Sequence, residues 1–457
     1  MTDTDYDAIV IGGGPAGSTA ATLVAKSGRR VLLLEQRETM PFKVGESLIP
    51  ATYETLARLD MLDKLRTSRF PKKYSVQFFS GSGKASAPFY FHETAGSDNY
   101  LERRSQTWQV LRSEFDTMLL DNAREHGVDV RLGVSVTDIL FDDDGRAVGV
   151  RARLPGEEVR NHGCPVVIDA TGQRALLSRR LKIRRHDPNL RMAAIFTHYR
   201  GARRDEGIDE GATLILRTED DQCWFWFIPL PDDRVSVGVV GPIDELIRDR
   251  PSDPQQVFEE ELSRCPGLTP RLENARQAMD VRVLNDFSYS SEKMAGDGWI
   301  LAGDAFGFLD PIYSSGVFLA LRSGEYVADA VISALAADDP SERRLRVFEP
   351  DLRAGMASFR QLIYAFYSRD FNFAHFLREY PQHRIAIIDI LVGDVFDRDF
   401  TALFDDMGKM IPLPPYPPSE GDHGVAGQQP SVADEVESDA SGSETSSARG
   451  WQLEASP

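Results

Sequence analysis

Residues 6–36 read "YDAIVIGGGPAGSTAATLVAKSGRRVLLLEQ". The pattern predicts a strand, a glycine turn, a helix and a second strand that ends at Glu35, which together form a βαβ unit. Gly12, Gly14 and Gly17 occupy the G-x-G-x-x-G positions, where the missing Cβ lets backbone N–H groups approach a pyrophosphate. Glu35 follows at the distance where a carboxylate accepts hydrogen bonds from ribose hydroxyls. The stretch predicts a dinucleotide site; a tight turn without a ligand is the alternative.

Two later stretches, "PVVIDATG" from Pro165 and "GWILAGDA" from Gly298, predict buried strands that return to the same sheet. Strand-like runs between them predict an antiparallel sheet on the substrate side. We therefore expect an α/β fold with a discontinuous Rossmann-type domain, an antiparallel-sheet substrate domain and C-terminal helices. The expected bounds are 1–188 and 286–338 for the nucleotide domain, 189–285 for the substrate domain, 339–411 for the helices and 412–457 for a disordered acidic tail.

The composition excludes several classes of protein. A formal net charge of −19 without a basic stripe disfavours nucleic acid and anionic membranes as partners. No apolar run reaches the roughly 20 residues that span a bilayer, and the acidic start is not a signal peptide, so we expect a cytoplasmic protein. Cys164, Cys223 and Cys265 lie far apart, which argues against a disulfide framework and a zinc site.

Four stretches in order, "VIGGGPAGS", "LRSEFDTMLLDNA", "VVIDATG" and "ILAGDAFGFLDPIYSSG", resemble the FAD enzymes built like aromatic hydroxylases and geranylgeranyl reductases. The resemblance implies that Arg112 helps to hold FAD, that Asp304 contacts the ribityl chain and that Pro311 lies beside the isoalloxazine ring. The cofactor residues expected on this basis are Gly12, Gly14, Ala16, Gly17, Glu35, Arg112, Gly303, Asp304, Pro311 and Gly316. No second glycine loop appears, so we expect a separate flavin reductase to supply reduced FAD.

The run "WFWFIP", Trp224 to Pro229, puts two tryptophans on one face of a predicted strand and two phenylalanines on the other. It is similar to the W-x-W-x-I-P pattern of the flavin-dependent halogenases within this larger family. "FKVGESLIPAT", which contains Glu46, resembles the G-E-S loop of that branch. "FPKKYSVQFFSG" resembles the segment with its essential lysine, which places that lysine at Lys73, or at Lys72 if the register is shifted by one.

The resemblance implies that reduced flavin and dioxygen convert halide into hypohalous acid, which travels to a separate aromatic substrate. Trp224 and Trp226 would then keep the substrate from the flavin, and the Lys73 ammonium would hold the electrophile. Backbone amides of Ser315 and Gly316, at a helix start, are the expected halide site. The plainer interpretation is that the tryptophans are core residues and the lysine is a surface residue.

Departures from the family pattern narrow the expected substrate. Tyr313 stands where the tryptophan halogenases have a glutamate, so we expect a phenol or a pyrrole, free or tethered to a carrier protein. Cys223 replaces a common glycine, and Ser75 and Ser80 stand where a glycine and a tryptophan are common. The alternatives are an FAD monooxygenase, a geranylgeranyl-reductase-like enzyme, and a flavin-holding protein without turnover.

Overall fold

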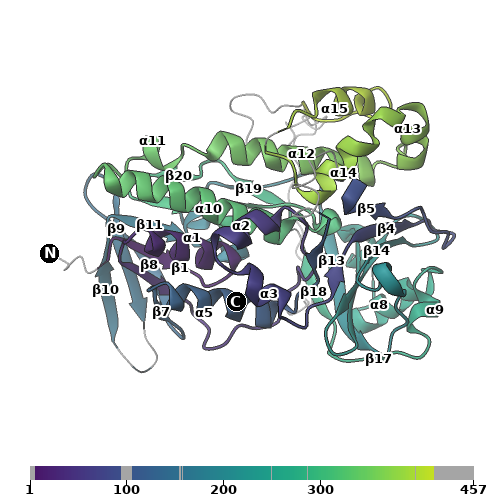
Figure 1. Ribbon diagram of the computed structural model, residues 1–457, viewed down its shortest axis with the longest axis horizontal. Helices are drawn as coiled ribbons and strands as arrows, with labels where there is room; N and C mark the ends of the chain where they lie inside the picture. Colours follow the sequence, from purple (N-terminus) through teal and green to yellow (C-terminus); the bar gives the residue numbers. More distant parts are fainter. Residues whose placement is uncertain are drawn as a thin grey trace, which may run out of the picture.

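The structure is a computed structural model, and it describes residues 6–93, 105–153, 156, 158–248, 250–285, 287–396 and 398–415. Most of the predicted tail, from residue 416 onward, lies outside the described residues. Figure 1 shows two sheet regions side by side, with a band of helices along one edge of both.

A six-stranded sheet forms the nucleotide-binding half, in the order β20-β21-β11-β1-β2-β7. All its pairings are parallel except that of β20 with β21. The strands are β1 (Ala8–Ile11), β2 (Val31–Leu34), β7 (Asp129–Arg131), β11 (Val166–Asp169), β20 (Ala295–Gly296) and β21 (Trp299–Leu301). The predicted return of the two later stretches to the sheet of the βαβ unit is confirmed by the pairing of β11 with β1 and of β21 with β11.

Helices α1 (Pro15–Lys26) and α5 (Arg112–Glu125) pack on this sheet, and α10 (Ser315–Ala336) packs against α1. Helix α1 begins with Pro15 at its first turn, where the missing N–H costs nothing. Side chains of α10 are buried on most sides, because the helix is sandwiched between α1 and the C-terminal helices.

Smaller sheets complete this half. β8 (Ser135–Phe141), β9 (Ala147–Arg153) and β10 (Val159–Gly163) form an antiparallel sheet that projects at one end (Figure 1). β12 (Arg184–His186), β19 (Tyr289–Ser291) and β22 (Gly307–Phe308) form another, and β3 (Lys72–Lys73) pairs with β6 (Thr107–Trp108).

The second half is built on a large sheet in the order β17-β13-β16-β15-β14-β4-β5, with β18 also on β13. Its strands are β4 (Ser75–Phe79), β5 (Phe89–Tyr90), β13 (Met192–Arg200), β14 (Thr213–Arg217), β15 (Trp224–Leu230), β16 (Arg234–Pro242), β17 (Arg276–Gln277) and β18 (Arg282–Asn285). The sheet is antiparallel except where β4 pairs with β14 in parallel. β4 and β5 belong to residues 1–188, the first part of the expected nucleotide domain. The large sheet therefore contains strands from both expected domains.

Both faces of the large sheet are covered. Trp224 and Trp226 pack into the hydrophobic core shared with the nucleotide-binding half, whereas Phe225 and Phe227 pack into a second core. Helix α8 (Pro254–Ser263) closes this second core, and the ring of its Phe258 lies edge-on to Phe225, with centroids 5.7 Å apart.

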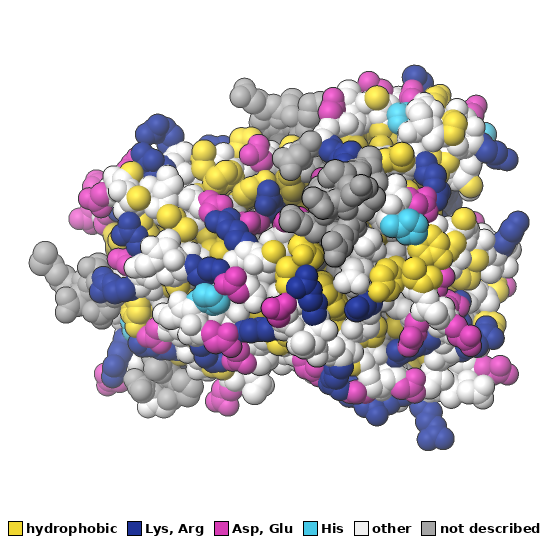
Figure 2. All heavy atoms as spheres, in the orientation of Figure 1, with side chains coloured by type: hydrophobic (Ala, Val, Ile, Leu, Met, Phe, Trp, Pro, Cys, Tyr) yellow, Lys and Arg dark blue, Asp and Glu magenta, His cyan; other side chains and the backbone are white. Residues whose placement is uncertain are grey.

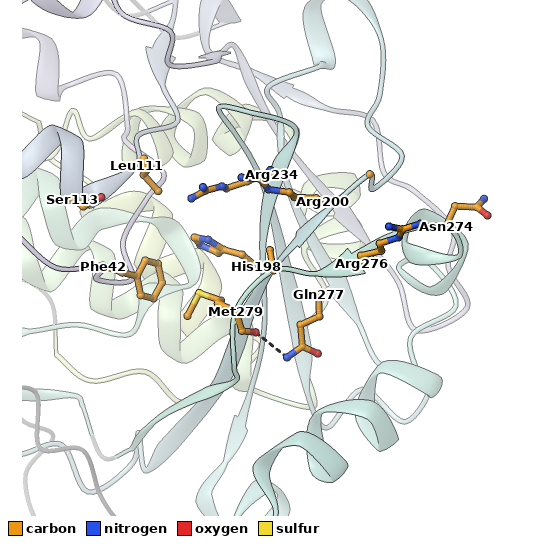
Figure 3. Close-up of a pocket in the computed structure, with 12 residues that line it drawn as sticks. Phe42, Leu111, Ser113, His198, Arg200, Arg234, Asn274, Arg276, Gln277 and Met279 are labelled. Atoms are coloured by element: carbon orange, nitrogen blue, oxygen red, sulfur yellow. Dashed lines mark hydrogen bonds between the residues drawn. The ribbon is translucent and has the colours of Figure 1, made fainter.

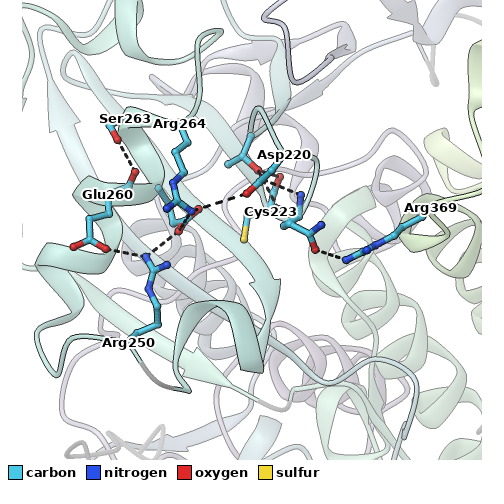
Figure 4. A network of polar contacts seen from close by, with 10 residues as sticks. Asp220, Cys223, Arg250, Glu260, Ser263, Arg264 and Arg369 are labelled. Atoms are coloured by element: carbon cyan, nitrogen blue, oxygen red, sulfur yellow. Dashed lines mark hydrogen bonds and ion pairs between the residues drawn. The ribbon is translucent and has the colours of Figure 1, made fainter.

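Polar contacts fasten α8 and the turn before β15 to the rest of the molecule (Figure 4). Arg250 donates hydrogen bonds to Glu260 and Glu261 on α8. Across the turn, Arg369 donates to the side chain of Gln222, next to the buried Cys223. The contact of Arg369 with Gln222 therefore fixes the turn that leads into the strand with the tryptophans, and those of Arg250 fix the C-terminal part of α8.

The remaining helices are α2 (Thr52–Arg58), α3 (Leu62–Arg66), α6 (Leu176–Arg180), α7 (Ile243–Leu246), α9 (Thr269–Leu272), α11 (Glu342–Leu345), α12 (Glu349–Tyr367), α13 (Phe373–Glu379), α14 (Arg384–Val392) and α15 (Thr401–Gly408). Basic and acidic side chains are interspersed on the face shown in Figure 2. Within the described ranges, no helix is both long and apolar enough to cross a bilayer.

Candidate active site

The glycine turn between β1 and α1 forms one end of a cavity of about 520 Å³. A Cβ on Gly12 would lie 2.4 Å from the carbonyl oxygen of Ala170, and one on Gly17 would lie 2.0 Å from the carbonyl oxygen of Gly12. These two glycines allow close backbone contact. A Cβ on Gly14, by contrast, would meet no atom within 4 Å, so this position leaves the helix N-terminus open to the cavity.

Glu35 lies directly after β2 on the wall of the same cavity. Its carboxylate accepts a hydrogen bond from the N–H of Gly13 at 2.8 Å and another from the N–H of Arg37 at 3.0 Å. The two bonds hold the side chain beside the glycine turn. This arrangement suits a dinucleotide whose pyrophosphate lies at the helix N-terminus and whose ribose reaches the carboxylate.

Arg112, the first residue of α5, and Asp304 both line the cavity. Arg112 donates hydrogen bonds to both carboxylate oxygens of Asp116 at 2.9 Å and to the carbonyl oxygen of Val44 at 3.0 Å. Burial raises the pKa of Asp304 to about 6, although the charges of Arg112 and Lys43 lower it. A buried carboxyl group on a cavity wall is well placed to bond the hydroxyl groups of a ribityl chain.

The predicted cofactor residues divide into two groups. Gly12, Gly14, Ala16, Glu35, Arg112, Asp304, Pro311 and Gly316 line the cavity. Gly17 and Gly303 do not line it and serve close packing instead, because a Cβ on Gly303 would lie 2.7 Å from Ala16 Cβ. The glycine cradle, the carboxylate after β2 and the buried carboxyl group fit FAD.

The two tryptophans form one wall of the cavity together with Ile228. Their ring centroids lie 6.2 Å apart, and the side chains are 2% and 4% exposed. The indole N–H of Trp226 donates to Ser236 Oγ at 3.0 Å, and that of Trp224 donates to Tyr367 Oη at 2.8 Å. Because both indoles are hydrogen-bonded and packed, the wall is rigid.

The contact of Trp224 continues into a chain of buried polar groups that the sequence analysis did not anticipate. Tyr367 at the end of α12 donates a hydrogen bond to Asp310 at 3.0 Å, and Asp310 also accepts from the N–H of Ile312. Burial raises the pKa of Asp310 to about 7. The chain links the tryptophan wall to the segment that carries Pro311. The only signal in the sequence is the run of aromatic residues between positions 359 and 376, which equally indicates helix packing.

The two adjacent lysines differ in their surroundings. The side chain of Lys72 is exposed, whereas Lys73 is 2% exposed. Lys73 Nζ donates hydrogen bonds to Ser47 Oγ at 2.8 Å and to the carbonyl oxygen of Leu48 at 3.1 Å. Burial lowers the pKa of Lys73 to about 7. Since Ser47 lines the cavity, Lys73 lies directly behind its wall.

Glu46, beside Ser47, projects a buried carboxylate on the cavity wall. His198 Nε2 lies 3.0 Å from Glu46 Oε1, but among the described residues no group donates a well-aligned hydrogen bond to the carboxylate. His198 was not predicted from the sequence. Its only distinguishing feature there is that it is a polar residue within a mostly apolar strand. The Glu46 carboxylate and the His198 imidazole, in contact with each other, therefore form a polar edge between the cavity and the large sheet.

The start of α10 closes the cavity near Pro311. Ser314 has a left-handed backbone with φ of 56°, so the chain turns sharply before the helix. Ser314 and Gly316 line the cavity. Ser315 is buried, and its hydroxyl has no hydrogen-bond partner among the described residues.

Comparisons with known proteins agree with this geometry. A family model described as an FAD binding domain matches residues 5–347, so the chain is an FAD-binding protein. The 1H-pyrrole-2-carbonyl-[peptidyl-carrier protein] chlorinase of Pseudomonas fluorescens is 30% identical over 426 residues, which cover 90% of this chain and 94% of that protein. The corresponding brominase of Pseudoalteromonas luteoviolacea is 32% identical and covers 86% of this chain and 93% of that protein.

Solved structures of flavin-dependent halogenases also resemble this chain. The flavin-dependent brominase Bmp2 matches with a TM-score of 0.78 and 30% identity, over 88% of this chain and 98% of that chain. The myxobacterial chondrochloren halogenase CndH matches with a TM-score of 0.72 and 31% identity, over 92% of this chain and 99% of that chain. The chain belongs to the flavin-dependent halogenases. The comparisons favour this family over the hydroxylase and reductase alternatives.

Proposed function

We propose that this halogenase acts on a pyrrole ring held as a thioester on a peptidyl carrier protein, and that Lys73 presents the halogenating species to that ring. Two relatives that match most of the chain are a chlorinase and a brominase of such a substrate, which supports the carrier-bound pyrrole. Tyr313, next to the cavity-lining Ser314, stands where the tryptophan halogenases have a glutamate, which supports a substrate other than free tryptophan.

The buried ammonium group of Lys73 is the observation that carries the proposal. An ammonium group is costly to bury without a counter-ion, and the two bonds from Nζ go to a hydroxyl and a carbonyl oxygen. A lysine kept in this position retains an N–H that can donate to an incoming oxygen atom. Exposed Lys72 has no such constraint, which favours Lys73 in the role.

Bound reduced FAD, with dioxygen, supplies the oxidising equivalent that converts halide into hypohalous acid. Trp224 and Trp226 keep an aromatic ring out of the cofactor cavity, so only a small oxidant passes. Lys73 Nζ donates a hydrogen bond to the oxygen of hypohalous acid and polarises its bond to the halogen. A ring C–H bond breaks, a carbon–halogen bond forms, and the hydroxide that leaves the halogen takes up the released proton as water.

The turn before α10 is the proposed halide site. Backbone N–H groups of Ser315 and Gly316 lie at the start of a helix of 22 residues, whose dipole favours an anion. The unpaired hydroxyl of Ser315 supports this assignment, because it is buried and has a proton to donate. A separate flavin reductase is the proposed source of reduced FAD.

The test uses the purified chain with a flavin reductase, NADH, FAD, oxygen and either chloride or bromide. Three substrates are compared by mass spectrometry: carrier-bound pyrrole-2-carbonyl, free pyrrole-2-carboxylate and a simple phenol. We expect halogen in the carrier-bound pyrrole. Hydroxylated product, or halogen only in the phenol, contradicts the proposal.

Lys73→Ala and Lys72→Ala form a matched pair of variants. We expect Lys73→Ala to bind FAD and consume oxygen but to lose halogenation by at least a hundredfold, whereas Lys72→Ala retains wild-type rates. Equal loss in both variants, or retained halogenation in Lys73→Ala, refutes the role of Lys73.

A further inference from the structure

A second pocket, of about 600 Å³, opens beside the cofactor cavity, between the end of the large sheet and the start of α5 (Figure 3). Phe42 and Leu111 form its wall on the nucleotide-binding side. On the opposite side, His198 of β13, Arg234 of β16 and Met279, two residues after β17, extend toward that wall. The pocket thus has an apolar wall and a cationic one.

The cationic wall is a row of arginines on three adjacent strands. Arg200 of β13 is directly opposite Arg234 of β16 on one side and Arg276 of β17 on the other. Like charges in directly opposed positions of a sheet repel each other and destabilise it. Arg200 and Arg276 are exposed and Arg234 is half-buried, so water, carboxylates or a bound anion can offset this repulsion.

Carboxylates do not offset this row. Within the described residues, no acidic side chain forms an ion pair with Arg200, Arg234 or Arg276, although the chain carries a formal net charge of −19. The nearby Asp233 instead accepts a hydrogen bond from the N–H of Gly201. The Nε atom of Arg234 is buried and has no hydrogen-bond partner in the part of the chain that the structure describes. The row is therefore open to an anion from outside the chain.

The pocket leads toward Lys73. Phe42 lines both the pocket and the cofactor cavity, and His198 in the pocket lies 3.0 Å from Glu46 on the cavity wall. Three strand spacings, roughly 14 Å, separate β13 from β14. On β14, Thr213 Oγ1 lies 2.9 Å from Ser47 Oγ, which accepts from Lys73. An extended phosphopantetheine arm is long enough for this separation.

We propose that the row of Arg200, Arg234 and Arg276 binds the phosphate of a carrier protein's phosphopantetheine arm, with the arm running along Phe42 toward Glu46 and Lys73. This inference rests on the proposed function. Arginines suit a phosphate because their planar groups donate parallel hydrogen bonds to its oxygens. Phe42 and Met279 suit the apolar part of the arm.

The test compares two small thioesters that differ only in the phosphate: S-(pyrrole-2-carbonyl)-4′-phosphopantetheine and its dephosphorylated form. For the wild type we expect KM to be at least tenfold lower with the phosphate. The advantage should fall to about twofold or less in Arg200→Ala and in Arg234→Ala. It should persist in Arg248→Ala, which removes an exposed arginine that pairs with Asp244. Formation of hypohalous acid, trapped by monochlorodimedone, should not change in any of these variants.

The outcomes separate the two proposals. Equal KM values for the two thioesters in the wild type, or an undiminished phosphate advantage in both arginine variants, refute the phosphate site and leave the proposed function intact. Halogenation of free pyrrole-2-carboxylate but of neither thioester refutes the proposed function and the inference together. Arginine-dependent competition by NADH would assign the pocket to a nucleotide and overturn the inference.

Discussion

Replacing Lys73 with methionine should stabilise the protein at neutral pH while abolishing halogenation. Burial lowers the pKa of Lys73 from 10.5 to about 7. Each pKa unit corresponds to about 1.4 kcal/mol, so the buried ammonium costs the folded state roughly 4 kcal/mol at pH 7. Methionine is similar in length and uncharged, and removes this cost. The acceptors on Ser47 and Leu48 lose a donor, which costs about 1–3 kcal/mol, so we expect a net gain of roughly 2 kcal/mol.

The stability that Lys73→Met gains over the wild type should decrease as the pH rises. Between pH 7 and 10.5 the unfolded chain keeps the proton on Lys73, whereas the folded chain loses it. Wild-type stability therefore rises with pH in this window, and the cost of the ammonium is fully present only below it. The advantage of Lys73→Met should shrink by about 2 kcal/mol between pH 7 and about pH 9.

Urea unfolding of the FAD-loaded protein, followed by tryptophan fluorescence at both pH values, measures this difference. Lys72→Met is the matched control, because that side chain is exposed and its replacement should change neither the stability nor its pH dependence. A destabilised Lys73→Met at pH 7, or the same pH dependence in the two variants, would refute the argument that a costly buried charge is kept for catalysis.

Further substitutions separate cofactor binding, the tryptophan wall and folding. Gly14→Ala should fold normally but bind FAD at least tenfold more weakly. Gly12→Ala should in addition lower the thermal midpoint of the apoprotein, because its Cβ meets backbone. Equal thermal midpoints for the two apoprotein variants would contradict this. Tyr367→Phe leaves the indole N–H of Trp224 unpaired, so we expect a loss of about 1–3 kcal/mol in urea unfolding and more oxidant released per halogenated product, measured as hypohalous acid trapped by monochlorodimedone. Ser236→Ala should cost a similar free energy on the other indole, and a change below 0.5 kcal/mol, roughly the limit of such measurements, would show that the bond is dispensable.

The strand pattern was predictable because it depends on local apolar periodicity. The βαβ unit and the two returning strands each combine a short apolar run with a glycine, and these signals do not need distant residues. The parallel pairing of β4 with β14 could not be found in this way. It joins residues separated by more than a hundred positions, and no local pattern encodes which edge of a sheet a distant strand will meet.

The candidate site likewise combines residues that the local sequence predicts with contacts that it does not. Glu35 and the glycine turn lie within one short stretch, so their spacing alone indicated a dinucleotide. The contact between His198 and Glu46 was not visible, because each residue looks ordinary in its own segment. Burial of Lys73 rather than Lys72 likewise depends on tertiary packing, since both lie on the two-residue strand β3.

The strand β4 ties the two halves of the molecule together. It begins two residues after Lys73 and is hydrogen-bonded into the sheet whose next strands carry the indoles. A hinge between the halves would have to tear this strand out, so the lysine and the cofactor chamber cannot swing apart during turnover. We therefore expect any exchange of flavin to depend on loops at the chamber's rim, with Lys73 and the indoles kept at constant separation.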